Sequence, residues 1–209
     1  MAKLYFRYGT VSSAKTLNLL AVFHNYGSQG KKAILVKPKT DDRFGASVVK
    51  SRAGLVMEAD YVLPPTGSIT QENLTNVECI LVDEVQFFAP SFIEQLRKIT
   101  LEHNIPAICY GLRTDFRTKL FEGSKRLMEL ADTIEEIKTT CSFCNKKSVY
   151  NLKQIDGVAV SDGPQIELGA EEKYLPTCGS CYAEKTQVKV KESTPKNTTT
   201  TTTTTTTTK

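Results

Sequence analysis

The sequence predicts an α/β protein in which helices flank a parallel β-sheet and a small cysteine-rich unit follows. Along residues 1–138, short apolar runs alternate with segments of helical periodicity, which is typical of a parallel sheet. A glycine-containing loop joins the first apolar run to the first helical segment, and two C-x-x-C pairs lie in residues 139–182. These observations predict a P-loop sheet domain over residues 1–138, a Cys₄ zinc-binding domain over residues 139–182 and a tail over residues 183–209.

The first strands and helix are marked by apolar runs near the N-terminus. Leu4–Tyr8 is short and aromatic and is predicted to be the first strand, while Ala33–Val36 is a continuous apolar run typical of a buried parallel strand. Between them, Thr16–Gly27 is predicted to be a helix that ends at glycines. The predicted apolar face of this helix consists of Leu17, Leu20 and Phe23.

The middle of the chain gives weaker signals. Pro38–Gly45 is predicted to be a loop, Val56–Leu63 a strand and Thr70–Leu74 the start of a short helix. Cys79–Val82 is a clear buried strand, and it ends directly before an acidic pair.

The remaining elements of the first domain again alternate in type. Pro90–His103 is predicted to be a helix with Phe92, Leu96 and Ile99 on its apolar face. Ile105–Tyr110 is predicted to be a strand, and a loop rich in aromatic and cationic residues follows. Ser124–Ala131 and Ile134–Ile137 are predicted to be the last helix and strand, whereas residues 139–182 contain short strand-like pieces and few helix signals.

Charge and composition limit the function classes. The formal net charge is +4, and the Lys/Thr-rich tail carries +3 of it, so residues 1–182 are nearly neutral. This excludes a broad basic face for duplex DNA, and we expect no nucleic-acid partner. No apolar run approaches the roughly 18 residues of a membrane span and no export signal is visible, so we expect a cytoplasmic protein without a membrane partner. The threonine run 198–208 has nothing to bury and is expected to be disordered.

The loop Gly9–Thr16 nearly matches the phosphate-binding pattern G-x-x-x-x-G-K-[ST]. It follows a predicted strand and opens a predicted helix, so its amides and the helix N-terminus favour an anion. Lys15 can reach the β- and γ-phosphates of ATP, and the Thr16 hydroxyl can hold Mg²⁺. Ala14 replaces the second glycine, which would cost about 1–2 kcal/mol if that position needs a left-handed backbone.

The acidic pair Asp83-Glu84 follows a buried strand and supplies the second half of a nucleotide site. Asp83 is placed to face Mg²⁺, and Glu84 could accept a proton from an attacking hydroxyl. Strand-end acids can also be helix caps or solvated charges. No histidine is available as an alternative base, because His24 and His103 lie on predicted helices without partners.

Two further groups of residues indicate binding sites. Cys141, Cys144, Cys178 and Cys181 form two close pairs whose spacing predicts a closed, structural Zn²⁺ site, with redox-active pairs as the alternative. The 33 residues between the pairs exceed what a compact zinc ribbon needs, so a loop must be held there. The loop Leu112–Phe121 mixes aromatic and cationic side chains, which suits a planar phosphorylated ligand or simply packing on the core. Cys79 and Cys109 lie in apolar strands and are predicted to be buried core residues.

Taken together, these motifs resemble those of the type II thymidine kinases, the zinc-containing cytosolic family. The resemblance covers roughly residues 3–182. The chain contains, in the family's order and approximate spacing, YGTVSSAKT, DDRFG, LVDEVQFF, YGLRTDFRTKLFEGS, CSFC, IELGAEEKYLPTC and CGSCY. Of these, D-E-x-Q-F and L-R-T-D-F are much more specific than a phosphate-binding loop alone. Ala14 and the threonine run depart from the family's pattern, and Val11 stands where some relatives carry methionine.

The resemblance implies an enzyme that transfers the γ-phosphate of ATP to the 5′-hydroxyl of thymidine to give dTMP. Glu84 would be the catalytic base, Lys15 would act on the phosphates, and Arg43 would offset charge on the transferring group. The residues implied in binding ATP and Mg²⁺ are Gly9, Thr10, Val11, Ser12, Ser13, Ala14, Lys15, Thr16, Asp41, Asp83 and Gln86.

The resemblance also implies a thymidine pocket and an assembly. The residues implied in contacting thymidine are Val11, Phe87, Leu112, Phe116, Phe121, Gln165, Ile166, Glu167, Leu168 and Tyr174. Those from Gln165 to Leu168 would belong to a lasso-like loop that binds the base through its backbone, and Tyr174 would close over the sugar. Zinc would tether both ends of this lasso. Members of this family are commonly homotetramers and are inhibited by dTTP.

Two other functions compete with the kinase interpretation. A nucleic-acid-linked P-loop ATPase with a zinc ribbon should have a basic zinc module, but residues 139–182 contain four lysines and five acidic residues. A nucleotide sensor that lost catalysis through Ala14 would leave Glu84 without a role.

Overall fold

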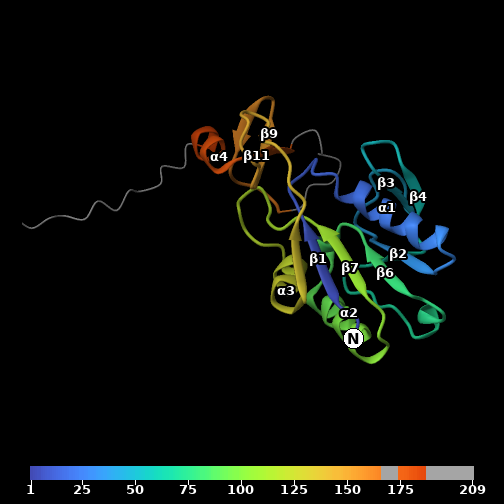
Figure 1. The fold of residues 1–209 in the computed structure, drawn as a ribbon. Coiled ribbons are helices and arrows are strands. Elements are labelled where there is room, and N and C mark those ends of the chain that lie inside the picture. Colours follow the sequence, from blue (N-terminus) through green and yellow to red (C-terminus); the bar gives the residue numbers. More distant parts are fainter. Residues whose placement is uncertain (166–173, 187–209) are drawn as a thin grey trace, which may run out of the picture.

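A six-stranded, fully parallel sheet forms the centre of the computed structural model, which describes residues 1–165 and 174–186. The strand order is β5-β2-β6-β7-β1-β8 (Figure 1). The strands are β1 (Leu4–Tyr8), β2 (Ala33–Pro38), β5 (Tyr61–Leu63), β6 (Cys79–Val82), β7 (Ala107–Gly111) and β8 (Thr133–Glu136). Five of the six strands predicted in residues 1–138 match β1, β2, β6, β7 and β8 to within two residues at each end. β2, β6 and β7 are apolar runs buried on both faces, which is why the sequence indicates them.

Helices cover both faces of this sheet. On one face, α1 (Lys15–Ser28) packs Leu19 and Leu20 against Leu35 and Leu81 of the strands. On the other face, α2 (Pro90–Glu102) and α3 (Glu122–Leu130) pack against side chains that alternate with these, such as Ile80. The predicted apolar face of α2 is confirmed, since it buries Phe92, Leu96 and Ile99.

The predicted face of α1 is correct only in part. Leu20 is buried and Phe23 packs against the same cluster, but Leu19 rather than Leu17 is the second buried leucine. Leu17 lies in the first turn of the helix and lines a pocket at the end of the sheet. The prediction of buried Cys79 and Cys109 is confirmed, as both are fully inaccessible.

The segment predicted as one strand over residues 56–63 is two strands in two sheets. β4 (Val56–Glu58) pairs antiparallel with β3 (Val48–Lys50), which the sequence did not indicate, and β5 pairs parallel with β2. Asp60 lies between β4 and β5, and its carboxylate accepts a hydrogen bond from the Leu35 amide at 2.7 Å. This contact fixes the chain at the point where it leaves the hairpin for the central sheet. Short 3-10 helices, η1 (Glu72–Leu74) and η2 (Val85–Phe87), flank β6.

A second, antiparallel sheet follows, with strand order β10-β9-β11. It is built from β9 (Tyr150–Ile155), β10 (Val158–Val160) and β11 (Tyr174–Thr177), and α4 (Gly179–Thr186) ends the described chain. Few helix signals were found in this part of the sequence, so helix α4 is a correction. We call residues 139–182 the cysteine module. Figure 1 shows its sheet beyond the ends of β1 and β7.

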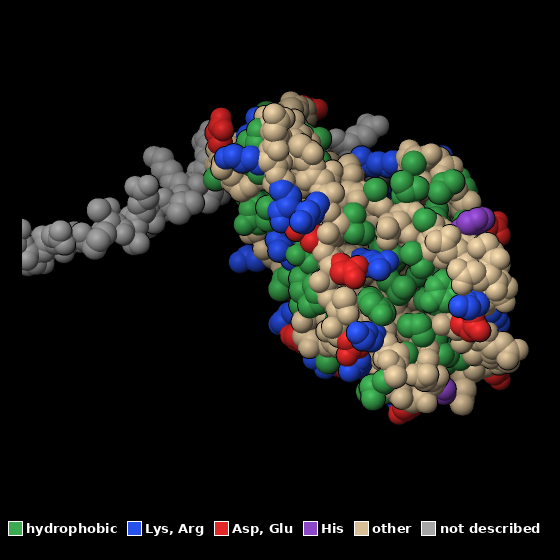
Figure 2. Space-filling view, viewed as in Figure 1, with side chains coloured by type: hydrophobic (Ala, Val, Ile, Leu, Met, Phe, Trp, Pro, Cys, Tyr) green, Lys and Arg blue, Asp and Glu red, His purple; other side chains and the backbone are tan. Residues whose placement is uncertain are grey.

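The described surface agrees with the charge pattern of the sequence. On the face in Figure 2, Lys and Arg side chains are interspersed with Asp and Glu and do not gather into one broad basic area. Among the described residues, no helix is long and apolar enough to cross a membrane. The threonine run 198–208 lies outside the described residues.

Candidate active site

The phosphate-binding loop connects β1 to α1, as the sequence predicted. Its first residue must be glycine, because a Cβ at Gly9 would overlap the Ser13 hydroxyl and lie 2.5 Å from the Ile137 carbonyl oxygen. At the other end of the loop, Lys15 is buried and its ammonium group donates to the Thr10 carbonyl at 2.8 Å. Burial lowers the pKa of Lys15, although the nearby carboxylates of Glu84 and Asp83 oppose the shift.

Ala14 adopts a left-handed backbone, with φ 63° and ψ 27°. Glycine is favoured in this conformation. The condition under which alanine was expected to cost stability, a left-handed backbone at this position, is therefore met. The residue is exposed, and the loop still places Lys15 and Thr16 at the start of α1. The substitution therefore strains the loop without removing its chemical groups.

Asp83 ends β6 opposite the first turn of α1. The Thr16 hydroxyl lies 3.2 Å from one of its carboxylate oxygens and 3.4 Å from the other. Burial, followed by repulsion from the adjacent Glu84 carboxylate, raises the pKa of Asp83 to about 7. A buried carboxylate beside a hydroxyl is a donor set that suits Mg²⁺, because a cation would relieve the cost of the buried charge.

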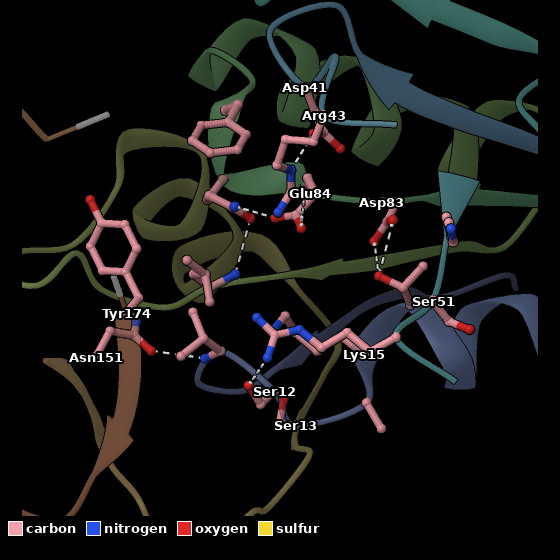
Figure 3. Close-up of a pocket in the computed structure, with 18 of the residues that line it drawn as sticks. Ser12, Ser13, Lys15, Asp41, Arg43, Ser51, Asp83, Glu84, Asn151 and Tyr174 are labelled. Carbon is pink, nitrogen blue, oxygen red and sulfur yellow. Dashed lines mark hydrogen bonds and ion pairs between the residues drawn. The ribbon is translucent and has the colours of Figure 1, made fainter. Parts of the chain in front are cut away.

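Glu84 is held by its neighbours in a left-handed conformation with φ 46°. Its carboxylate accepts from the Arg43 guanidinium at 2.8 Å and from the Gln86 amide at 2.5 Å, and Arg43 also pairs with Asp41 at 2.5 Å (Figure 3). Burial alone would raise the pKa of Glu84, but Arg43 and Lys15 outweigh it and lower the pKa. The group is therefore ionised at neutral pH, which is the form a general base requires.

The aromatic residues predicted around the base come together on one wall. The Phe87 and Phe121 rings meet edge to face at 6.0 Å, and the Phe116 and Tyr174 rings lie 6.2 Å apart. Phe116 and Phe121 are buried, so the loop between β7 and α3 both packs on the core and faces the site. Ile166, Glu167 and Leu168 lie outside the described residues.

A single pocket of about 410 Å³ unites these groups. Of the predicted residues it is lined by Val11, Ser12, Ser13, Ala14, Lys15, Thr16, Asp41, Arg43, Asp83, Glu84, Gln86, Phe87, Leu112, Phe116, Phe121, Gln165 and Tyr174. Gly9 and Thr10 do not line the pocket, although both belong to the loop and the Thr10 carbonyl accepts the Lys15 ammonium group. The sheet thus brings a phosphate-binding side and an aromatic side to one acidic pair.

Several lining residues were not predicted from the sequence. Lys50, Ser51 and Arg52 come from the β3–β4 hairpin, and the Arg52 guanidinium donates to the Ser12 hydroxyl at 2.6 Å. Asp115 and Asn151 also line the pocket. Asp115 belongs to the L-R-T-D-F motif, although it was not predicted to line the site, whereas the sequence carries no motif for the other four. An Asn inside a predicted strand is unusual enough to have served as a signal.

The four predicted cysteine ligands form one cluster. All four sulfur atoms lie within 4.8 Å of one another, and Cys144 Sγ is 3.6 Å from Cys178 and 3.7 Å from Cys181. Tetrahedral Zn–S bonds of about 2.3 Å place sulfurs about 3.8 Å apart, so the donors fit Zn²⁺. Burial opposes ionisation of Cys141, but backbone hydrogen bonds outweigh it and lower the pKa to about 6. The thiolate is therefore favoured at Cys141, whereas the hydrogen bond to Cys178 and burial raise the pKa of Cys181 to about 12 in the metal-free cluster.

Comparison with known proteins identifies the family. The family model for thymidine kinase matches residues 2–182. The chain belongs to the thymidine kinase family. The predicted function of thymidine kinase is therefore confirmed, and a zinc-ribbon ATPase is not favoured.

Curated relatives of this kinase agree over nearly their whole length. The thymidine kinase of Lactiplantibacillus plantarum is 43% identical over 87% of this chain and 96% of its own. Those of Lactococcus lactis and Enterococcus faecalis are each 41% identical over 87% of this chain, covering 97% and 95% of theirs. A Pif1 helicase structure overlaps with a TM-score of 0.37 and 16% identity over 65% of this chain and 39% of the helicase chain, which supports no inference.

Replacing Ala14 with glycine is expected to stabilise the kinase. Glycine relieves the left-handed strain but loses more backbone entropy on folding, so we expect a gain of about 0.5–1 kcal/mol in the free energy of unfolding. ATP affinity should change by less than about tenfold, because Lys15 and Thr16 remain. Urea unfolding and ATP titration measure both quantities. The exposed helical Ala21→Gly is the matched control and should destabilise by about 1 kcal/mol; a loss of stability in both variants would contradict the strain at Ala14.

Replacing Asp83 with asparagine is expected to stabilise the ligand-free kinase at pH 8 by about 1–3 kcal/mol. The pKa of Asp83 is about 7 in the folded chain, above the roughly 3.9 of an unfolded aspartate, so the folded state binds more protons between these values. The stabilisation by this proton is present below pH ~4 and lost as the pH rises through 7.

Urea unfolding at pH 4 and pH 8, without nucleotide or divalent cation, measures this gain. The exposed neighbour variant Asp42→Asn is the control and should change stability by less than about 0.5 kcal/mol at either pH. An Asp83→Asn effect that is equal at the two pH values would rule out the raised pKa as its cause.

Proposed function

We propose that this kinase transfers the γ-phosphoryl group of ATP to the 5′-hydroxyl of thymidine, with Glu84 as the base. The observation that carries the proposal is the single pocket that joins the phosphate-binding loop, the acidic pair and the aromatic wall. ATP phosphates on the loop and a nucleoside against Phe116 and Tyr174 would both approach Glu84 from opposite sides. The 5′-hydroxyl would give its proton to the Glu84 carboxylate as its oxygen bonds to the γ-phosphorus and ADP leaves.

The surrounding residues have distinct parts in this proposal. Lys15 binds the β- and γ-phosphates, and the Thr16 hydroxyl and Asp83 would hold Mg²⁺, which neutralises charge on the phosphates when bound. Arg43 keeps Glu84 ionised and in place through its ion pairs with Glu84 and Asp41, and it presents positive charge to the transferring group. Gln86 fixes the second oxygen of Glu84.

The nucleoside side follows the family resemblance. We propose that Phe87, Phe116 and Phe121 pack around the thymine ring, that Val11 and Leu112 lie near its methyl group, and that Tyr174 closes over the sugar. Backbone groups of residues 165–168 would hydrogen-bond the base. The Gln165 side chain donates to Asp115 at 3.1 Å, which anchors the start of that segment to the aromatic loop.

The cysteine cluster is proposed to hold structural Zn²⁺ through Cys141, Cys144, Cys178 and Cys181. The donor set supports this, since four thiols leave no position open for catalysis. We also propose, from the sequence pattern and the cysteine spacing, a P-loop domain over residues 1–138, a zinc-binding domain over residues 139–182 and a tail over residues 183–209. The family resemblance covers the first two. The same resemblance supports a homotetramer, feedback inhibition by dTTP and a cytoplasmic location.

A nucleoside panel tests the proposed reaction. The purified enzyme with ATP and Mg²⁺ should convert thymidine to dTMP with matching release of ADP, and should convert adenosine and guanosine at least about 100-fold less efficiently, because a purine does not fit a wall shaped for a pyrimidine. ATP hydrolysis without dTMP would instead indicate an ATPase, and nucleotide binding without turnover would indicate a sensor.

A further inference from the structure

We infer that Asn151, in the cysteine module, is a positioning residue that sets the phosphate-binding loop for phosphoryl transfer. The inference rests on the proposed function, because it assigns the loop to ATP. It adds a contact that no sequence motif predicts, between the cysteine module and the phosphate-binding loop.

The Asn151 side chain bridges three segments. It projects from β9 toward the loop (Figure 3), where its carbonyl oxygen accepts a hydrogen bond from the Val11 amide at 2.8 Å. Its NH₂ group donates to the Thr114 carbonyl, in the loop after β7, at 3.0 Å. Asn151 is 3% exposed, so water cannot easily replace either bond. One amide therefore connects the phosphate loop, the aromatic loop and the cysteine module.

A second contact from the same module reaches the neighbouring loop residue. The Ser148 and Thr10 hydroxyls lie 2.6 Å apart and are buried. The carbonyl of Thr10 in turn accepts the Lys15 ammonium group. Ser148 therefore contacts Thr10, whose carbonyl accepts the Lys15 ammonium group, and Asn151 contacts the next residue, Val11.

The loop needs such support because its own backbone is strained. Ser12 and Ala14 both have positive φ, at 60° and 63°, and neither is glycine. Non-glycine residues persist in this region only where surrounding contacts enforce it. The contacts at Thr10 and Val11 come directly before the strained stretch, so their loss would let the loop relax away from the geometry in which its amides face phosphate.

The test measures nucleotide and nucleoside binding separately. In Asn151→Ala we expect the Kd of Mg·ADP, measured by calorimetry, and the KM of ATP each to rise about tenfold. In Ser148→Ala, which removes one oxygen, both should rise about fivefold. Thymidine KM should change by a smaller factor than ATP KM in each variant, whereas a general loss of folded protein would leave both affinities unchanged and lower only kcat.

Lys147→Ala is the matched control. Lys147 also joins the cysteine module to the central sheet, through an ion pair with Glu136 at 2.5 Å, but it does not line the pocket. Its ADP affinity should stay within about twofold of wild type. If Asn151→Ala does not fold, Ser148→Ala decides the question alone. An ADP affinity within twofold of wild type in a folded Asn151→Ala variant, or in Ser148→Ala where Asn151→Ala does not fold, would overturn the inference, as would a rise in KM confined to thymidine. Because ADP binding is read directly, this outcome is distinct from a wild-type enzyme that makes no dTMP.

Discussion

Replacing Glu84 with glutamine is expected to lower kcat for thymidine phosphorylation about 10³-fold, within the range typical of a lost general base. Glutamine keeps the size of the side chain and can still contact Arg43 and Gln86, so the pocket should retain its shape. The change removes the negative charge that pairs with Arg43 and, with it, the ability to accept the proton of the 5′-hydroxyl. A steady-state assay of dTMP formation at saturating ATP and thymidine measures the loss.

Binding measurements show whether this loss is chemical. Because Glu84 does not form the phosphate loop, the Kd of Mg·ADP should stay within about threefold of wild type. The exposed helix-end variant Glu102→Gln should have wild-type activity. A Glu84→Gln enzyme that keeps a tenth or more of the wild-type kcat would exclude Glu84 as the base and leave only a structural role for its ion pair with Arg43.

Removal of the metal from the cysteine cluster is expected to raise the thymidine KM at least about tenfold while the central sheet stays folded. Cys141 and Cys144 precede β9, and Cys178 and Cys181 follow β11, so the metal would fix both ends of the second sheet. Tyr174 belongs to β11 and lines the pocket. Without the metal, binding of thymidine must also order these strands, and that cost appears as weaker affinity.

Chelation followed by metal analysis and kinetics tests this coupling. Far-UV circular dichroism should retain the signal of the parallel sheet and helices, and hydrogen exchange should increase first in β9 and β11. Re-addition of Zn²⁺ should restore the original KM, which separates metal loss from irreversible damage. Full activity with an unchanged thymidine KM after verified metal removal would show that the cluster does not support the nucleoside site.

The predictability of each element follows from what fixes it. β2, β6 and β7 are almost wholly buried and β1 buries Leu4 and Phe6, so a short run dominated by apolar residues suffices to indicate each of them. The hairpin strands β3 and β4 are half exposed and only three residues long, and the residues that pair in them are six to ten positions apart. The local sequence pattern therefore predicted β4 and β5 as one strand. In the structure Asp60 lies between them and accepts a hydrogen bond from the Leu35 amide.

The residues of the candidate site also differ in how well the sequence predicts them. Sequence motifs predicted the residues at the start of α1 and after β6, namely Lys15, Thr16, Asp83 and Glu84. The C-x-x-C spacing predicted the four cysteines. Asn151 and Arg52 have no such motif. They reach the site because a separate sheet and a separate hairpin fold over the same strand ends.

The sequence by itself determined the parallel sheet, the phosphate loop, the acidic pair, the cysteine cluster and the resemblance to thymidine kinases, because each depends on residues close together in the chain or on a fixed spacing. The tertiary structure decided that Ala14 has a left-handed backbone conformation and that Arg43 forms ion pairs with both Asp41 and Glu84. It also decided that the cysteine module forms hydrogen bonds with the phosphate-binding loop. These features depend on hydrogen bonds between residues up to 140 positions apart, and such long-range contacts form only once the chain has folded.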